Sequence, residues 1–372
     1  ICDPTCGSGG FLIKAFEYVR EKIETDVRGQ KEKLRKELEG DNFDSKPESE
    51  QIAINEQIDK MQTALNSELD TSIEGSRMYQ LSHNCIYGTD ANPRMARTSK
   101  MNMIMHGDGH GGVHHHDGLL NVNGIFEERF DIILTNPPFG QNVDRNQLIS
   151  EADRFTDDEM KRKYRAKYGK VYDEALKQVD DHIGKSLLSL YDLGSTSTLS
   201  EVLFMERCLR LLKKGGRMGM VLPEGVLNNK NLAAVREYFE GRAKLILICS
   251  IPQDVFIAAG ATVKPSLVFM RKFTAEEEAE YEKCKKEATD EVTAFYQSDI
   301  DSFNATIASC ERITDSLKID LKVARKKLKQ AKNDKKAQKD ISAIETIIEN
   351  IQQEQNENRN NKKNAEKGLK EL

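Results

Sequence analysis

The chain has 372 residues, of which 31% are charged and 38% are hydrophobic. This length is enough for one domain of about 250 residues with additional elements, and the high charge indicates that part of the chain lies outside a hydrophobic core. No run approaches the ~20 apolar residues of a membrane span and no signal peptide opens the chain, so we expect a cytoplasmic protein that does not enter a membrane.

The net charge and the cysteine content narrow the possible classes of protein further. The formal net charge of −5 argues against a stand-alone DNA-binding protein, although residues 311–372 carry 16 Lys and Arg against 11 Asp and Glu. The simplest interpretation of this basic tail is a solvated helix face. The seven cysteines form no C-x-x-C pair, which indicates reduced thiols rather than a zinc site or a disulfide framework.

A Gly-rich turn lies between the end of a strand at residues 1–3 and a helix with apolar residues at helical spacing in 11–19. The turn consists of Asp3, Pro4, Thr5, Cys6, Gly7, Ser8 and Gly9. Glycines let a backbone approach a ligand closely, and a helix N-terminus offers unpaired N–H groups. The Asp3 carboxylate can accept a hydrogen bond from an ammonium, so the turn suits the methionine part of S-adenosylmethionine. The alternative is a tight structural turn. Because a strand needs about five residues, we expect the natural N-terminus to lie upstream.

The next stretch, residues 21–80, is rich in charged residues and Gln and is predicted to be a helical excursion broken at 40–47. Short apolar runs then alternate with helical patterns as far as residue 272. The predicted strands are 85–87, 130–134, 218–222, 245–251 and 266–270, and the clearest helices are 199–212 and 231–239. This alternation predicts an α/β domain over 1–272, with a doubly wound, mostly parallel sheet covered on both faces.

Two more predicted strand ends carry carboxylates. Asp90 ends the second strand and is followed by Asn92, before a helix. An acid at this place in a nucleotide-binding sheet can accept both ribose hydroxyls, whereas Asp and Asn there also commonly cap helices. Asp117, followed by Gly118, ends a third and weaker strand, where a carboxylate can bind the adenine amine of the cofactor.

Five histidines near this third strand raise the question of a metal site: His106, His110, His114, His115 and His116. A transition-metal site requires fixed ligand geometry, and the intervening Gly-rich stretch 107–112 does not supply a helix-spaced pair. We therefore predict no metal site.

The most specific motif, Asn136-Pro137-Pro138-Phe139, follows the strand predicted at 130–134. An exocyclic amine on adenine is a poor nucleophile because its lone pair is delocalised into the ring. The Asn136 side-chain oxygen and the Pro137 carbonyl can accept the two amine hydrogens, which favours a tetrahedral nitrogen. Consecutive prolines fix the backbone, and Phe139 offers an aromatic face to a base turned out of the duplex. The alternative is a Pro-Pro turn after a buried strand.

The tail, residues 273–372, shows heptad spacing rather than strands. Apolar residues recur at steps of four and three in 317–331 and again in 337–351, with a break at 332–336 where Asn333-Asp334 can turn. This pattern predicts an antiparallel hairpin of two coiled-coil helices that needs a partner. We expect 313–351 to dock on another subunit. The alternative is packing on this chain's own sheet.

The segments DPTCGSGGFL, YGTDANP and NPPFG resemble the motifs of the DNA adenine amino-methyltransferases. DPTCGSGGFLIKAFEYV, TDANPRMARTSKMNMIMHG and LSEVLFMERCLRLLKKGGRMGMVLPEGVLNN more closely resemble the modification subunit of type I restriction-modification systems. The resemblance implies the Rossmann-like fold of S-adenosylmethionine-dependent methyltransferases. In such a fold the Gly-rich turn would hold the methionine moiety, Asp90 the ribose, Asp117 the adenine of the cofactor, and the tetrapeptide the target base.

The same resemblance implies an adenine-specific DNA methyltransferase from a prokaryote. Its expected partners are double-stranded DNA with a flipped adenine, a specificity subunit bound through the C-terminal helices, a second modification subunit, and a nuclease or translocase subunit. The family has an N-terminal helical domain and a further cofactor-contacting segment that this sequence lacks, so we expect an N-terminal truncation. Methylation of RNA adenine or protein glutamine remains an alternative, as does a non-catalytic scaffold, although the intact Asn136 and Phe139 argue against a scaffold.

Overall fold

The computed structural model describes residues 1–108, 111–255, 263–333 and 338–371. By its internal contacts the chain divides into two compact units, Ile1–Glu278 and Ala279–Leu372. Within the described residues, no helix is both long enough and apolar enough to cross a membrane.

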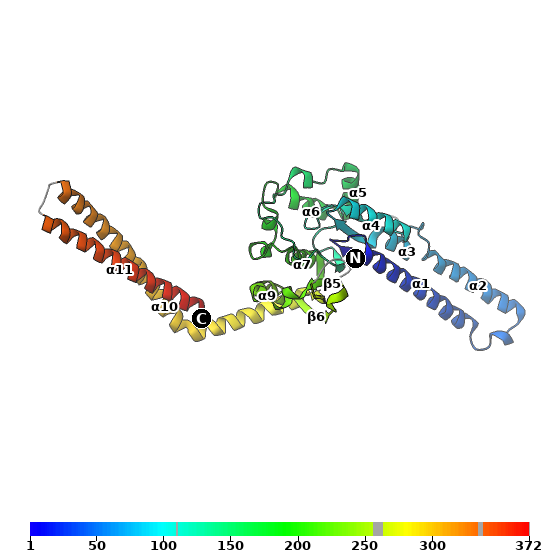
Figure 1. Ribbon diagram of the computed structural model, residues 1–372. Helices are drawn as coiled ribbons and strands as arrows, with labels where there is room; N and C mark the ends of the chain where they lie inside the picture. The colour runs from blue at the N-terminus through cyan, green and yellow to red at the C-terminus, as the bar shows by residue number, and fades with distance from the viewer. Residues whose placement is uncertain (109–110, 256–262, 334–337, 372) are drawn as a thin grey trace. The chain divides into compact units, whose positions relative to one another are not determined.

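The first unit is built on one seven-stranded sheet with the order β3-β2-β1-β4-β5-β7-β6. Figure 1 shows this unit in blue to yellow. Strands β1 to β5 pair in parallel, and β7 runs antiparallel to both β5 and β6. The prediction of a mostly parallel, doubly wound sheet is confirmed. The strands are β1 (Cys2–Asp3), β2 (Tyr87–Asp90), β3 (Val113–His115), β4 (Phe130–Thr135), β5 (Leu212–Pro223), β6 (Ala243–Ser250) and β7 (Pro265–Lys272).

One predicted strand begins later than expected. The apolar run 85–87 is mostly not strand, because residues Leu81–Cys85 form a π-helical turn and β2 begins only at Tyr87. The other four predicted runs lie in or overlap β4, β5, β6 and β7.

Nine α-helices accompany the sheet among the described residues of this unit. They are α1 (Gly10–Glu39), α2 (Glu48–Ser67), α3 (Arg77–Gln80), α4 (Pro93–Met105), α5 (Asp158–Tyr168), α6 (Lys170–Asp180), α7 (Ser200–Leu211), α8 (Glu224–Asn228) and α9 (Ala233–Glu240). The predicted excursion at 21–80 is a helical hairpin of α1 and α2, and it breaks where predicted. There Gly40 ends α1 with φ 61°, a conformation that glycine adopts without strain.

The direction of the crossovers decides which face each helix covers. The path β1–α1–β2–α4–β3 moves across the sheet one way, and β4–α7–β5 moves the other way. Because such crossovers are right-handed, the two sets of helices lie on opposite faces. One core therefore packs Leu12, Phe16 and Met103 under α1 and α4. The other core lies between the helices α7 and α9 and the strands β4, β5 and β7. It also contains Tyr164 of α5 and Tyr172 of α6.

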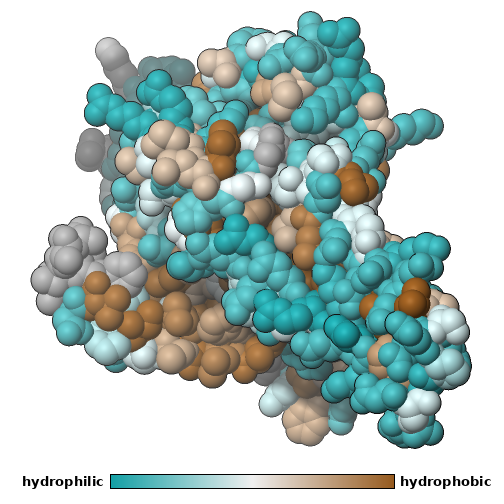
Figure 2. Space-filling model, turned by 90° about the vertical axis from the view of Figure 1, so that its right-hand side faces the viewer, coloured by the Kyte–Doolittle hydropathy of each residue, from teal (hydrophilic) through white to brown (hydrophobic). Residues whose placement is uncertain are grey.

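This arrangement leaves part of one face uncovered, contrary to the expectation that helices cover both faces. Ile132 of β4 and Ile246 of β6 are 40% and 56% exposed, and Phe269 lies between them over Gly219. They line a shallow apolar hollow of about 340 Å³, on which no helix lies within the described residues. The surface in Figure 2 is mostly hydrophilic, with apolar atoms gathered in a band at its lower left.

The second unit is a helical hairpin. Helix α10 (Ala275–Asn333) begins in the first unit, and α11 (Gln338–Glu371) returns antiparallel to it, as the pairs Lys332–Glu345 (2.9 Å) and Lys362–Glu311 (2.8 Å) show. The seam buries the predicted heptad residues Leu317, Ala324 and Ala331, together with Cys310 and Ala365. The predicted hairpin is confirmed and is longer than 313–351. Of its predicted turn, Asn333 ends α10 and Asp334 lies outside the described residues.

Helix α7 is buried almost throughout, and it carries an arginine in the core. Arg207 is 0% exposed and donates to the carbonyls of Gly118 (3.1 Å) and Leu120 (2.9 Å) and to the Asn121 side chain (2.8 Å). One guanidinium therefore holds the loop that follows β3 against α7.

Arg207→Met should lower the free energy of unfolding by roughly 3 kcal/mol or more, because it leaves three buried acceptors unpaired. Urea unfolding measures this change. Arg217→Met, at an exposed position on β5, is the matched control and should change stability by less than about 0.5 kcal/mol. Equal effects of the two substitutions would contradict the role given to Arg207.

Candidate functional site

The predicted site residues meet at the carboxyl edge of the sheet. Each group follows the end of a parallel strand: the Gly-rich turn follows β1, Asp90 ends β2, Asp117 follows β3 and the tetrapeptide follows β4. Because β1 lies between β2 and β4, the turn lies beside both. This edge, where the order of connection reverses, is where open α/β sheets bind ligands.

The Gly-rich turn and Asp90 form one structure. The backbone N–H of Gly7 donates to Asp90 Oδ2 at 2.9 Å, and the N–H of Asn92 donates to Oδ1 at 2.8 Å. Gly7 (φ 54°) and Gly9 (φ 90°) are both left-handed. A Cβ placed on Gly7 would meet no atom within 4 Å, so the backbone there faces open space, whereas Gly9 packs closely on Ser99 of α4.

The other turn residues are fixed mainly through backbone atoms. Thr89 Oγ1 donates to the Pro4 carbonyl (2.9 Å), the Cys6 N–H to the Thr89 carbonyl (2.9 Å), and the Asn102 amide to the Ser8 carbonyl (3.0 Å). Burial raises the pKa of the Cys6 thiol well above its ordinary value, so this cysteine stays neutral and serves packing.

Asp3 is 2% exposed and its contacts fall on one oxygen. Oδ1 accepts from the Thr5 N–H (3.0 Å) and from the Thr135 hydroxyl (2.6 Å), with the Thr5 hydroxyl at 3.4 Å. Burial raises the pKa of Asp3 to about 7, although these hydrogen bonds favour the charged form and partly oppose the shift. The charge of Asp3 therefore titrates near neutral pH.

Asp117 and Gly118 lie against the first turn. Burial raises the pKa of Asp117, whose Oδ1 accepts from the Leu119 N–H at 2.9 Å. A Cβ on Gly118 would stand 2.0 Å from the Pro4 carbonyl oxygen, so glycine is required there for the loop after β3 to approach the turn. Asn92, by contrast, uses its side chain to cap α4, accepting from the N–H of Arg94 at 2.9 Å. Its side chain thus adopts the helix-capping role that was the alternative to ligand binding.

The tetrapeptide is held at both ends. Thr135, just before it, bonds to Asp3 and Thr5 of the turn. Beyond it, Ser200 Oγ donates to the Pro138 carbonyl at 3.0 Å, and the Glu201 carboxylate accepts from the Gly140 N–H at 3.1 and 3.2 Å. Pro137 is buried, Phe139 is half-buried and Asn136 is exposed, so the backbone is fixed while the Asn136 amide faces outward.

Three residues of this arrangement were not predicted from the sequence: Thr135, Ser200 and Glu201. Ser200 and Glu201 come from the first turn of α7, some 60 residues beyond the motif that they hold. A polar pair at a helix N-terminus suggests capping before any other role. Only Thr135 had a local signal in the sequence, because it directly precedes Asn136.

The histidines diverge in the structure. His106 pairs with Glu17 (3.0 Å), His115 contacts the Ala91 carbonyl, and His116 contacts the Asp117 and Asp153 carbonyls. His110 lies outside the described residues. Among the residues that are described, no group of three His, Cys, Asp or Glu side chains could hold a metal ion.

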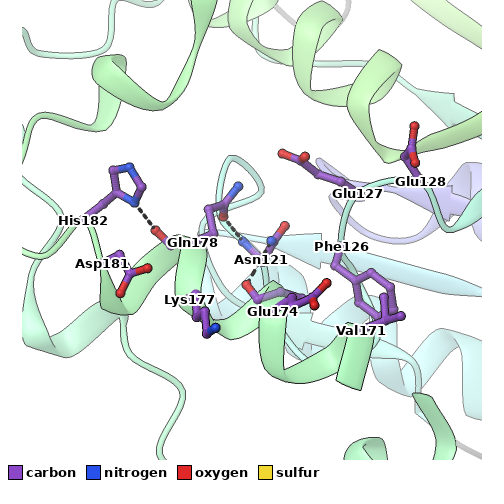
Figure 3. A pocket seen from close by; sticks show the side chains of 11 residues that line it. Asn121, Phe126, Glu127, Glu128, Val171, Glu174, Lys177, Gln178, Asp181 and His182 are labelled. Atoms are coloured by element: carbon purple, nitrogen blue, oxygen red, sulfur yellow. Dashed lines mark hydrogen bonds between the residues drawn. The ribbon is translucent and has the colours of Figure 1, made fainter. Parts of the chain in front are cut away.

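A hollow of about 600 Å³ lies elsewhere, between α6 and residues 121–128 (Figure 3). Several of its polar groups are paired: the Asn121 N–H donates to Gln178 (2.8 Å), the Asn121 amide donates to the Ala175 carbonyl (3.1 Å), and Glu127 pairs with Arg210. Residues 126–128 lead into the start of β4, so this end of the hollow is at the amino edge of the sheet. We assign it a structural role and not the candidate site.

The carboxyl edge is equipped to hold a nucleoside with a charged amino-acid end. Glycines leave space over the turn, Asp90 and Asp117 offer acceptors, and Asp3 supplies a carboxylate next to the turn. The donors and acceptors present therefore fit S-adenosylmethionine. Next to it, Asn136 and the Pro137 carbonyl offer two oxygen acceptors to an amine.

Comparison with known proteins gives one family match. The model of the N-6 DNA methylase family matches residues 73–172 and 195–368, which together make up more than half of the chain. The matched ranges include Asp90, Asp117 and the tetrapeptide, as well as most of the helical hairpin. The Gly-rich turn precedes them.

Several solved structures are similar to the chain. One comes from a structural study of complex assembly and conformational transition of the type I R-M system. It is 22% identical to this chain, with a TM-score of 0.43, over 73% of this chain and 37% of that one. The type I restriction enzyme EcoKI M protein is 18% identical, with a TM-score of 0.41, over 74% of this chain and 40% of that one. A modification subunit of a putative type I restriction enzyme from Vibrio vulnificus YJ016 is 17% identical, with a TM-score of 0.39, over 78% and 48%. The chain thus spans less than half the length of each.

Asp3→Asn should stabilise the protein at alkaline pH. The folded protein binds the Asp3 proton more tightly than the unfolded chain does, since the pKa is about 7 rather than 3.8. The free energy of unfolding of the parent therefore falls as pH rises from about 4 to about 7. Asparagine keeps an oxygen acceptor for Thr5 and Thr135 without the buried charge.

We expect Asp3→Asn to be more stable than the parent at pH 8 by up to about 4 kcal/mol, the equivalent of three pKa units, and the difference to shrink toward pH 4. Urea unfolding at both pH values measures it. Asp41→Asn, at an exposed position after α1, is the control and should show no such trend. A stability difference that does not change with pH would contradict the raised pKa of Asp3.

Proposed function

Because the chain belongs to the N-6 DNA methylase family, we propose that it transfers a methyl group from S-adenosylmethionine to the N6 amine of adenine in DNA, as the modification subunit of a type I restriction-modification complex. The observation that carries this proposal is the convergence of two motifs at one edge of the sheet. The Gly-rich turn and Asp90 are joined by hydrogen bonds, and Thr135 ties the same turn to the start of Asn136-Pro137-Pro138-Phe139.

The first motif would hold the cofactor. Asp90 would accept from the ribose hydroxyls through lone pairs that its two backbone donors leave, and Asp117 would accept from the adenine amine. The contacts of Asp3 fall on Oδ1, which leaves Oδ2 for the ammonium of the methionine end. Once bound, the cofactor supplies a methyl group activated by its attachment to a positively charged sulfur.

The second motif would activate the target amine. The Asn136 side-chain oxygen and the Pro137 carbonyl would each accept one amine hydrogen, which withdraws the nitrogen lone pair from the ring and directs it at the methyl carbon. The Ser200 and Glu201 contacts hold this backbone before substrate arrives, so orientation costs little at the moment of reaction. Neither amide oxygen is basic enough to keep the proton that the amine releases, and it passes to water at the exposed Asn136.

The helical hairpin would bind the specificity subunit. The family match extends to residue 368, so this hairpin is part of what the family shares. Its outer surface carries apolar side chains one helical turn apart, Ile319 and Val323, which are 64% and 47% exposed. Such residues on an otherwise charged helix suit a helix–helix interface with a partner. A second modification subunit and a nuclease or translocase subunit would complete the complex.

Asn136→Ala should abolish methyl transfer and leave cofactor binding nearly intact, because it removes an acceptor for the target amine outside the cofactor site. Labelled-methyl transfer, with the specificity subunit and duplex DNA present, measures the first. Calorimetry with S-adenosylmethionine measures the second, with Asp90→Ala as the matched control that should lose binding. Transfer at the parent rate by Asn136→Ala would overturn the proposed mechanism.

The same transfer assay separates the alternative substrates. Label in RNA or in a protein glutamine, with none in DNA, would point to another planar nitrogen as the target. Cofactor binding without transfer to any of the three would point to a scaffold.

Replacing Ile319 and Val323 together with Asp should weaken capture of the specificity subunit by at least tenfold, because charge cannot be buried in an apolar contact. Binding is measured with purified subunits. Val292→Asp is the control, since Val292 is also exposed on α10 but lies outside 313–351. Undiminished capture by the double variant, or by a chain that lacks the hairpin, would refute docking through these helices.

A further inference from the structure

A buried network of hydroxyls and one carboxylate joins the two motifs of the site. It consists of Asp3, Thr5 and Thr135, at the carboxyl ends of the neighbouring strands β1 and β4. Thr5 belongs to the Gly-rich turn, and Thr135 is the residue directly before Asn136. The two threonine oxygens lie 2.6 Å apart, although 130 positions separate them in the sequence.

The proton count fixes the direction of these hydrogen bonds. Each threonine hydroxyl has one proton, and an ionised carboxylate only accepts. When Asp3 is ionised, the Thr135 hydroxyl donates to Asp3 Oδ1 at 2.6 Å, whereas the Thr5 hydroxyl lies 3.4 Å from the same oxygen. The shorter contacts are therefore both made if Thr5 donates to Thr135 at 2.6 Å. The N–H of Thr5 also donates to Asp3 Oδ1, at 3.0 Å. Each member therefore depends on the others.

Burial makes this dependence strict. Thr135 is 0% exposed and Asp3 is 2% exposed, so neither can replace a lost partner with bulk water. A change in the turn that moves Thr5 takes away the donor to Thr135. As a β-branched residue, Thr135 has few side-chain conformations with which to compensate, so the backbone leading into Asn136 must adjust.

The far end of the tetrapeptide does not share this dependence. Pro138 and Gly140 are bonded to Ser200 and Glu201 of α7, and neither of these two residues is hydrogen-bonded to Thr5 or Asp3. The turn therefore influences the tetrapeptide at the Asn136 end, where the target amine would be held.

We propose that Thr135 is a positioning residue that couples the cofactor site to the catalytic tetrapeptide: a cofactor on the Gly-rich turn holds Thr5, and through Thr135 it orders Asn136. This inference rests on the proposed function. Coupling between two sites is reciprocal, so an ordered tetrapeptide also favours the conformation of the turn that binds cofactor. The arrangement makes the target amine meet its two acceptors when the methyl donor is in place.

Hydrogen exchange tests the coupling without DNA. The full chain is incubated in deuterated buffer with and without S-adenosylmethionine, and uptake is followed in peptides that span 130–142. Pro137 and Pro138 have no N–H, so the signal comes from the amides around them. In the parent we expect cofactor to slow exchange in this segment at least threefold.

Thr135→Val replaces the hydroxyl with a methyl of similar size, and Thr135→Ala removes it without adding bulk. Both should still bind cofactor by calorimetry, with an affinity lowered by the loss of the reciprocal coupling, but should lose the cofactor-induced protection at 136–141. Thr135→Ser keeps the hydroxyl and should restore the protection. Thermal unfolding of each variant shows whether it is folded. The alanine variant is used for the test if the valine variant is unfolded.

The outcomes separate this inference from the proposed function. A parent that binds no cofactor overturns both. A parent that binds cofactor but shows no protection at 136–141, or a folded Thr135→Val or Thr135→Ala variant that keeps the protection, overturns the coupling and leaves the proposed function standing. Protection that requires the hydroxyl supports the coupling.

Discussion

The parallel pairing of β1 with β4, in which Cys2 lies opposite Ile133, is the constraint on which the site depends. The chain leaves β1 in one direction across the sheet, returns, and leaves β4 in the other. Neighbouring parallel strands end at the same edge, so the turn after β1 and the tetrapeptide after β4 must come within reach of one another. Every contact between them, including that of Thr135 with Asp3, follows from this register. The same reversal sends the crossover helices to opposite faces, and it leaves the hollow lined by β4, β5, β6 and β7 without a helix among the described residues.

The sequence allowed the sheet and the position of its motifs to be predicted, because each motif sits at a strand end and parallel strands align their ends. The glycine pattern, the strand-end acids and the Pro-Pro step are local signals. Asp90 lies beside the Gly-rich turn because β2 pairs in parallel with β1. The hairpin could be predicted from heptad spacing, because that spacing places apolar residues in a stripe on each helix and the two stripes pack against each other. Its polar contact at Asn358, which donates to the Cys310 carbonyl at 2.7 Å, is not visible in that spacing.

The features that could not be predicted depend on contacts between residues that are far apart in the sequence. Glu201 reads as a helix-start acid until the fold brings Gly140 to it. Asn92 could bind a ligand or cap a helix, and its side chain caps α4, a role that depends on where the fold starts that helix. The apolar run in β6 reads as a buried strand, yet Ile246 is exposed because burial depends on which neighbours the topology provides. Arg207 reads as a charged residue on the polar side of a helix, and it is buried because three acceptors after β3 happen to meet there.

Asp3 shows why such a site is costly to keep. A carboxylate with no nearby cation among its described contacts, buried enough to raise its pKa to about 7, lowers the stability of the fold at neutral pH. An asparagine would satisfy the same two threonines at lower cost. Under the proposed function a ligand would bring the missing positive charge, and an ammonium at Oδ2 would lower the pKa of Asp3 again. Under that proposal the stability that Asp3 costs the fold and the affinity for a cationic ligand would have one origin, the carboxylate charge that the turn encloses.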